Sequence, residues 1–203
     1  MSNNHAFAII QAYNWTQAVI YQGERVFENF NRDNSMFERM RAFDEFPSGV
    51  QNIDTLNQSH LLFEESRQNQ FIRVMDEHYF VIALGKSIDY MKIFSEFDHI
   101  VQEIDSMFSL RKINDLRNMR EHDDEYTSGN GRAQSRFEFI DIKRSCGGDM
   151  TGTICSSTEY YLGNVEIRSI VAFYRSKLTE IEGIYYNKLN SLYNNYGDDN
   201  LEK

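Results

Sequence analysis

The sequence predicts a mainly α-helical protein, an up-and-down helical bundle with a β-hairpin inserted before the last helix. Apolar residues recur three and four positions apart over long segments, which is the period of an amphipathic helix. The chain has one proline, Pro47, so little interrupts long helices. Only residues 127–164 change to an alternating pattern between glycine-rich turns. A chain of 203 residues with 41% hydrophobic residues can bury a core, and we expect one domain over residues 1–203.

The N-terminal region, residues 1–67, is expected to be helical with interruptions. A long amphipathic helix is predicted over residues 4–30. The polar run 31–35 is expected to break it, and a short helix over residues 37–46 is expected to end at Pro47, Ser48 and Gly49. The apolar residues of 54–67 follow neither the helical period nor the alternation of a strand, so this segment is ambiguous.

Two further helices are predicted in the middle of the chain. One covers residues 70–97, and its apolar stripe comprises Phe71, Val74, Met75, His78, Val81, Ile82, Gly85 and Ile88. On this stripe, His78 is expected to be a core histidine bonded to a neighbour. The other helix begins near Ser106 and is ended by the breaker sequence of residues 127–131.

The predicted insertion, residues 127–164, is expected to form a β-hairpin. Residues 137–142 alternate as a half-buried strand does, and residues 146–149 form a turn of Cys, Gly, Gly and Asp. Residues 151–161, rich in Thr, Ile and Tyr, are expected to be the return strand. Residues 163 and 164 close the insertion, and a last amphipathic helix is predicted over residues 165–196.

The net charge and the number of cysteines argue against several classes of protein. The net charge of −10 argues against bulk binding of DNA or RNA, although residues 107–144 carry 8 Lys or Arg and 7 Asp or Glu and are therefore the least acidic part. Cys146 and Cys155 are too few for a disulfide framework or a zinc site built of cysteines. No leader-like or membrane-spanning segment is evident, so we expect a cytoplasmic protein without membrane contact.

The segment from Arg117 to His122 carries most of the functional argument. Arginine can hold a phosphodiester, and histidine can transfer a proton near neutral pH. On a helix, Asn118 and His122 share one face, whereas Arg117 points about 140° away from His122. Metal-independent RNA cleavage needs both a base and an acid, and this segment offers one histidine. The chemistry therefore favours a homodimer that brings two such segments together.

These residues resemble the signature of the HEPN superfamily, which is an arginine, a polar residue, a short spacer and a histidine. The resemblance implies a dimerising helical bundle, and many HEPN proteins are metal-independent ribonucleases of toxin–antitoxin, phage-defence or abortive-infection systems. It implies that Arg117 binds phosphate, that Asn118 orients the histidine or the substrate, and that His122 is the general acid or base. The resemblance also implies an RNA substrate and an antitoxin or other protein partner, and it implies neither a cofactor nor a metal.

Other interpretations remain open. Some HEPN proteins are noncatalytic, so the chain would then be a module that binds a nucleotide or a protein. Arg117 can also simply pair with Glu121 one turn later, with His122 at the helix end. A third alternative is a metal site of the HD phosphohydrolase type, which would combine His122 and Asp123 with His99 and with Asp141 or Asp149.

Overall fold

The computed structural model describes residues 3–44, 53–122, 130, 153–155, 160–163 and 165–198. Its helices are α1 (Asn3–Asp44), α2 (Ile53–Met91), α3 (Asp98–Phe108), α4 (Leu110–Glu121) and α7 (Ile167–Asp198). A short 3₁₀ helix, η1 (Ser95–Phe97), precedes α3, and the strands β1 (Thr153–Cys155), β2 (Tyr160–Leu162) and β3 (Val165–Glu166) precede α7. The predicted mainly α bundle with a small antiparallel β-hairpin before the last helix is confirmed.

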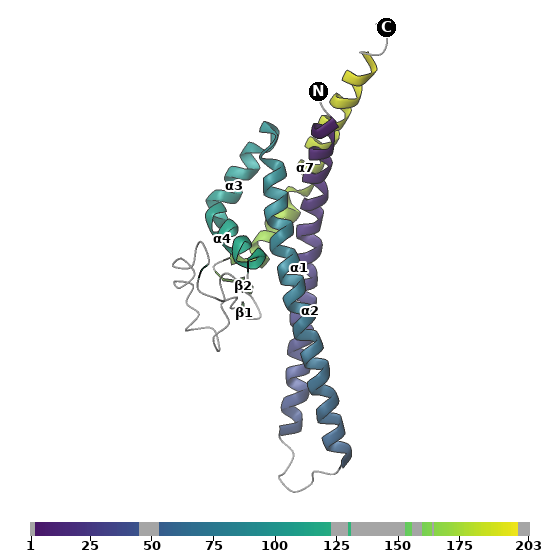
Figure 1. Ribbon diagram of the computed structural model, residues 1–203, viewed down its shortest axis with the longest axis vertical. Helices are drawn as coiled ribbons and strands as arrows, with labels where there is room; N and C mark the ends of the chain where they lie inside the picture. Colours follow the sequence, from purple (N-terminus) through teal and green to yellow (C-terminus); the bar gives the residue numbers. More distant parts are fainter. Residues whose placement is uncertain are drawn as a thin grey trace.

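The two longest helices, α1 and α2, form an antiparallel pair that sets the long axis of the molecule (Figure 1). Helix α7 lies along the N-terminal part of α1, and α3 and α4 lie beside the C-terminal part of α2. The other end of the pair, made of the end of α1 and the start of α2, extends beyond these helices. The core therefore sits at one end of the pair.

The core is built from the apolar stripes of the five described α-helices and the small sheet. Burial of these side chains is the main favourable term in folding. Fully buried residues include Ile9 and Val19 of α1, Phe80, Leu84 and Ile88 of α2, Ile100 and Ile104 of α3, Ile113 and Met119 of α4, Tyr160 and Leu162 of β2, and Ile170, Tyr174 and Ile181 of α7. The predicted last helix begins at Ile167, within two residues of the expected start.

The predicted break of the first helix at residues 31–35 is wrong, because α1 continues to Asp44. Four of these five polar residues are exposed on the continuing helix, and the fifth, Asp33, faces α2. Asp33 accepts a hydrogen bond of 2.9 Å from Nη1 of Arg73, and Asn29 donates to Asp76. Residues 54–67, whose pattern fitted no single period, lie in the first part of α2.

The predicted long helix over residues 70–97 ends at Met91, and the helix expected to begin near Ser106 is two helices, α3 and α4. Ser109 separates them with a φ of 61°, a left-handed conformation that non-glycine residues seldom adopt. Asp105 stabilises the corner, since its backbone carbonyl accepts from Ser109 N and its carboxylate from Leu110 N. The helix that carries the Arg–His segment, α4, is therefore only 12 residues long.

The three strands form one antiparallel sheet in the order β1–β2–β3. Residues 151–161 were expected to be a single return strand, but β1 and the start of β2 both fall within them, paired Cys155 to Tyr160. Gly163, with a φ of 56°, turns the chain between β2 and β3. The strand predicted over residues 137–142 lies outside the described residues.

None of the helices in the described part of the chain has an apolar stretch that could cross a membrane.

Candidate functional site

The Arg–His segment occupies the last two turns of α4, beside the C-terminal part of α2. The Arg117 side chain lies across α2 at Gly85. Its Nη1 donates a hydrogen bond of 2.6 Å to Oδ2 of Asp89, and its Nε donates one of 3.1 Å to Oε1 of Glu121. The expected pairing of Arg117 with Glu121 is therefore present, and Asp89 adds a second carboxylate that the sequence did not suggest.

The surroundings of Arg117 fix the position of its guanidinium and keep it protonated. Partial burial lowers the pKa of the guanidinium, but the hydrogen bonds and charges of Asp89 and Glu121 outweigh burial, and the net pKa is raised. The Arg117 side chain retains 20% exposure. A fixed, permanently charged guanidinium at the surface is suited to holding an anion.

Asn118 and His122 are one turn apart, as predicted. His122 is the C-cap of α4, and its backbone N–H donates to the backbone carbonyl of Asn118 at 3.0 Å. Asn118 is half-buried, whereas His122 is exposed. The structure thus places all three predicted residues at one end of α4, while the hydrogen bonds of Arg117 go to carboxylates rather than to His122.

A buried ion pair within the motif fixes α4 to α2. Nη2 of Arg120 donates to Oε2 of Glu77 at 3.1 Å, and both side chains are at most 5% exposed. Oη of Tyr160, on β2, donates to the other oxygen of Glu77 at 2.6 Å. Glu77 therefore joins α2, α4 and the sheet at one point, and the direction in which the last turn of α4 faces depends on it.

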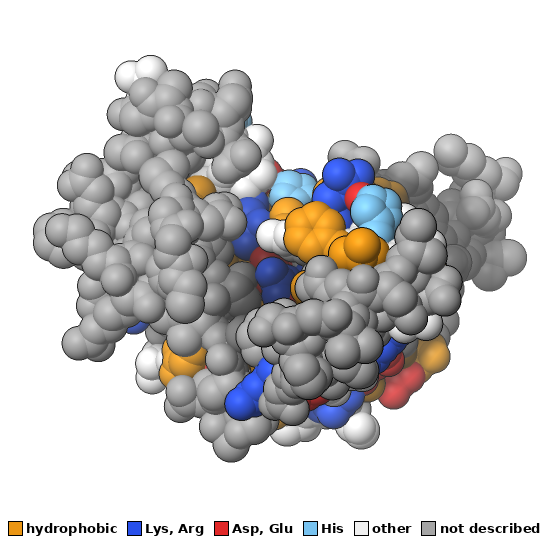
Figure 2. Space-filling model, turned by 90° about the horizontal axis from the view of Figure 1, so that it is seen from below, with side chains coloured by type: hydrophobic (Ala, Val, Ile, Leu, Met, Phe, Trp, Pro, Cys, Tyr) orange, Lys and Arg blue, Asp and Glu red, His pale blue; other side chains and the backbone are white. Residues whose placement is uncertain are grey.

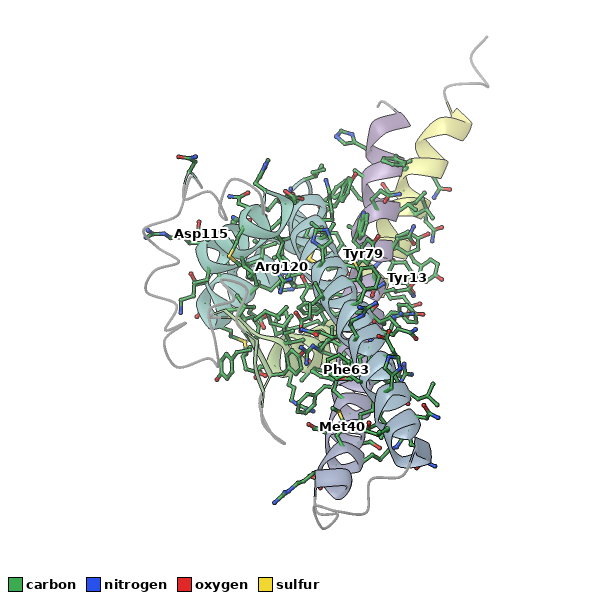
Figure 3. All side chains as sticks on the ribbon, turned by 60° about the horizontal axis from the view of Figure 1, so that its bottom comes forward. Tyr13, Met40, Phe63, Tyr79, Asp115 and Arg120 are labelled. Carbon is green, nitrogen blue, oxygen red and sulfur yellow. The ribbon has the colours of Figure 1, made fainter. Side chains whose placement is uncertain are left out.

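Sequence reasoning missed this cluster, although a signal was present. Asp76 and Glu77 are adjacent carboxylates next to the apolar stretch Phe80–Leu84 of α2, and buried carboxylates require cationic partners. Arg25 supplies one for Asp76, with a contact of 2.8 Å from Nε to Oδ1. Figure 3 shows Arg120 between α4 and α2, near the level of Tyr79.

His78 is not the core histidine that its stripe suggested. It is half-buried, and its ring lies 5.7 Å from that of Tyr79. Burial lowers the pKa of His78, the charge of Arg120 lowers it further, and the charge of Glu121 raises it. Because Arg120 and Glu121 immediately precede His122, His78 lies close enough to the end of α4 to feel the charges of its last turn.

The HD-type alternative receives no support from the described residues. His99 lies on α3, and its Nε2 is 2.6 Å from Oε1 of Glu180 on α7. Asp123, Asp141 and Asp149 lie outside the described residues. Within the part of the chain that the structure describes, no group of three His, Cys, Asp or Glu side chains is placed to hold a metal ion.

Two cavities lie away from the Arg–His segment. A cavity of about 330 Å³ lies at the α3–α4 corner against β2 and β3, lined by Asp105, Ser109, Lys112, Tyr161 and Glu166 among others. One of about 190 Å³ lies between α1 and α2, lined by Asp33, Met40, Ser66, Gln70 and Arg73.

No protein-family model matches the chain, and no curated protein or solved structure matches it. The resemblance to the HEPN superfamily accordingly rests on the residues of the motif and on the chemistry that their positions allow.

Proposed function

We propose that the chain is a HEPN-like, metal-independent endoribonuclease of a prokaryotic toxin or phage-defence system, acting as a homodimer. The observation that carries the proposal is the position of Arg117 and His122 at one exposed end of α4, with Arg117 fixed at the surface. A phosphodiester held by Arg117 would lie within the reach of groups that transfer protons.

The carboxylates on Arg117 do not prevent phosphate binding. Asp89 is 47% exposed and Glu121 31% exposed, and ion pairs at such a surface contribute at most about 1 kcal/mol. A phosphate that accepts two hydrogen bonds from a guanidinium forms a stronger contact and can displace one carboxylate. The carboxylates would hold Arg117 in place when no RNA is bound.

The test is cleavage of mixed-sequence single-stranded RNA in the presence of EDTA. We expect the wild-type chain to cleave, and His122→Ala to lose about 100-fold or more of the rate while retaining its helical circular dichroism. His99→Ala is the matched control, since His99 is also exposed but lies on α3. Cleavage by His122→Ala at the wild-type rate would overturn the proposal, as would dependence on Mn²⁺.

One observation favours a second candidate, a noncatalytic HEPN-like module that binds a protein. Arg117 faces two carboxylates, so the three groups together carry a net charge of −1, which weakens the attraction of this surface for phosphate. A partner with a basic side chain would fit this surface. Absence of RNA cleavage by the folded wild-type chain, together with retention of a partner that Asp89→Asn releases, would favour this module.

A further inference from the structure

The free end of α2 carries a row of exposed apolar side chains, here termed the α2 stripe: Leu56, Phe63, Phe71 and Val74. At 100° per residue, these four positions lie within about 80° of one another around the helix. Phe63 is 61% exposed and Phe71 is 68% exposed. Figure 2 views the molecule from this free end and shows apolar side chains gathered with histidine and arginine side chains. Apolar side chains that gather on one surface in this way indicate a contact surface.

Helix α1 packs on the opposite side of α2 and leaves the stripe exposed. The buried residues Leu62, Asn69 and Asp76 point about 140° or more away from the middle of the stripe. Two of them contact α1, because Asn69 donates to Met36 and Asp76 pairs with Arg25. The exposed residues described over positions 31–41 of α1 are all polar or charged. Solvent therefore suits the outer side of α1, whereas the outer side of α2 suits a protein partner.

The free end of the pair has little core of its own. Over residues 30–41 of α1 and 56–70 of α2, the buried apolar residues are Phe30, Met36 and Leu62. Most of the stability of a helix in a protein comes from packing of its apolar face. Packing against the α2 stripe would supply the burial that this end of the molecule lacks.

The stripe continues along α2 into the contact with α4. Val81 and Gly85 point in the same direction as the stripe, but Val81 is fully buried and Gly85 lies under Arg117. Arg120, near the end of α4, binds Glu77 between Val74 and Val81. Helix α4 thus covers this face of α2 down to about the level of Glu77. A second protein seated on the stripe would lie next to the end of α4, where the Arg–His segment is.

We propose that the α2 stripe is the contact between two copies of this chain, whose α2 helices pack in parallel about a two-fold axis. The inference rests on the homodimer of the proposed function and specifies its interface. In a parallel pair, each stripe residue faces its own copy, and the two α4 helices face each other across the axis, because both lie on the face that carries the stripe. Two histidines, His122 of each chain, then supply the base and the acid.

The parallel orientation follows from the position of α4 relative to the stripe. The end of α4 lies at the level of Glu77, about 12 residues beyond the middle of the stripe. An antiparallel pair centred on the stripe would therefore place the two Arg–His segments roughly 35 Å apart, at opposite ends of the contact. Only the parallel pair brings both segments to one phosphodiester.

The size and charge of the stripe are compatible with this contact. Its four apolar side chains expose on the order of 400 Å². That is about half of the ~800 Å² that each partner buries in a specific interface, and the polar residues of this face and the two α4 ends would supply the rest. Arg67 lies in the middle of the stripe and would face its own copy. Its Nη2 is 3.6 Å from Oε2 of Glu64, which offsets the repulsion between the two guanidinium groups.

The first experiment measures the oligomeric state of the full chain by sedimentation equilibrium. We expect a wild-type dimer, and in Phe63→Glu a dissociation constant raised about 100-fold or more, because two carboxylates would meet in an apolar contact. Leu61→Glu is the matched control: Leu61 is 67% exposed on the same helix but points about 160° away from Phe63. This control is expected to dimerise as the wild type does, and circular dichroism checks that both variants fold.

The second experiment tests the orientation and its consequence for cleavage. In a chain with Cys146 and Cys155 replaced by serine, Leu56→Cys should be joined to its own copy by a short bismaleimide, whereas Leu61→Cys should not. Parallel packing brings the two residues 56 together, and antiparallel packing separates them. We also expect monomeric Phe63→Glu to lose about 100-fold or more of the rate of RNA cleavage in EDTA, and Leu61→Glu to keep it.

The outcomes separate this inference from the proposed function. A Phe63→Glu variant that dimerises like the wild type would overturn the inference and leave a ribonuclease that dimerises through another surface. The inference would also be overturned if Leu56→Cys dimers gave no cross-link, or if monomeric Phe63→Glu cleaved RNA at the wild-type rate. A monomeric wild-type chain would overturn both the inference and the homodimer. A wild-type dimer that Phe63→Glu dissociates, but that cleaves no RNA, would overturn the ribonuclease and leave the interface in place.

Discussion

Arg117 crosses α2 directly over Gly85. A Cβ atom at residue 85 would lie 2.5 Å from Cδ of Arg117, so the arginine occupies space that only glycine leaves open. Glycine inside a helix is less favourable than alanine by up to about 1 kcal/mol. Gly85 thus lowers the stability of α2 where Arg117 lies, next to the Asp89 carboxylate that binds this arginine.

Gly85→Ala should therefore impair the site without unfolding the protein. We expect the added methyl group to move Arg117 off Asp89 and to reduce RNA cleavage about 10-fold or more, with a stability change within about 1 kcal/mol. Kinetics and thermal unfolding check this. Gly183→Ala is the matched control, because nothing lies within 4 Å of a Cβ there; it should raise stability and leave cleavage unchanged. If Gly85→Ala and Gly183→Ala cleaved RNA at the same rate, Arg117 would not lie against Gly85 as described.

Gly23→Ala should act on stability rather than on the site. A Cβ at residue 23 of α1 would overlap Cγ2 of Val171 on α7 and lie 3.3 Å from the ring of Phe80 on α2. Overpacking of a close helix contact costs about 1–3 kcal/mol. Urea unfolding should show this loss with an unchanged m-value. A variant as stable as the wild type would show that α1 and α7 do not pack this closely.

The buried pair of Arg120 and Glu77 should be sensitive to removal of one partner. Arg120→Met leaves the Glu77 carboxylate buried with fewer cationic partners and is expected to lower the free energy of unfolding by about 3–5 kcal/mol. Tyr160→Phe removes only the hydroxyl that donates to Glu77, with an expected loss of about 1–3 kcal/mol. Because both act on one carboxylate, the double variant should deviate from additivity in chemical unfolding. Strict additivity would count against the shared cluster.

Glu166 should make the stability of α7 depend on pH. Burial raises the pKa of its carboxyl, but hydrogen bonds from the Ser169 side chain and from the backbone N–H groups of Ser169, Tyr160 and Arg168 outweigh burial and leave the net pKa lowered. A lowered folded pKa gives stability that is present above the unfolded pKa, about 4.3, and is lost as the pH falls through the folded pKa. Glu166→Gln should thus lose about 0.5–2 kcal/mol at pH 7, and the difference should shrink below pH 4. A difference that persists unchanged at pH 3 would assign the effect to packing.

The helical architecture could be predicted from the sequence because the apolar period is local information. The start of the last helix was predicted at residue 165, two residues before its observed start at Ile167. The break predicted at residues 31–35 is wrong, because four of these polar residues are exposed on a continuing helix and Asp33 pairs with Arg73 of α2. Likewise, Ser109 ends α3 with a positive φ, which the sequence around this serine does not predict.

The site could be predicted only in part. The position of Arg117, Asn118 and His122 on one short helix follows from their spacing, and so does the pair of Arg117 with Glu121. The pairing of Arg117 with Asp89 and of Arg120 with Glu77 could not be predicted, because helix packing brings the two carboxylates to α4 from 28 or more residues away in the sequence. Phe71 was expected in the core, yet it is exposed because no described element covers α2 below α4.

The most direct test of the central claim uses one RNA oligonucleotide that the chain cleaves in EDTA, and the same oligonucleotide with a 2′-hydrogen at the nucleotide preceding the cut. Attack by the 2′-oxygen predicts cleavage of the first, with a 2′,3′-cyclic phosphate end identified by mass spectrometry, and no cleavage of the second at that position. Cleavage of both at equal rates would contradict the account, since the two histidines would then have no 2′-hydroxyl proton to move.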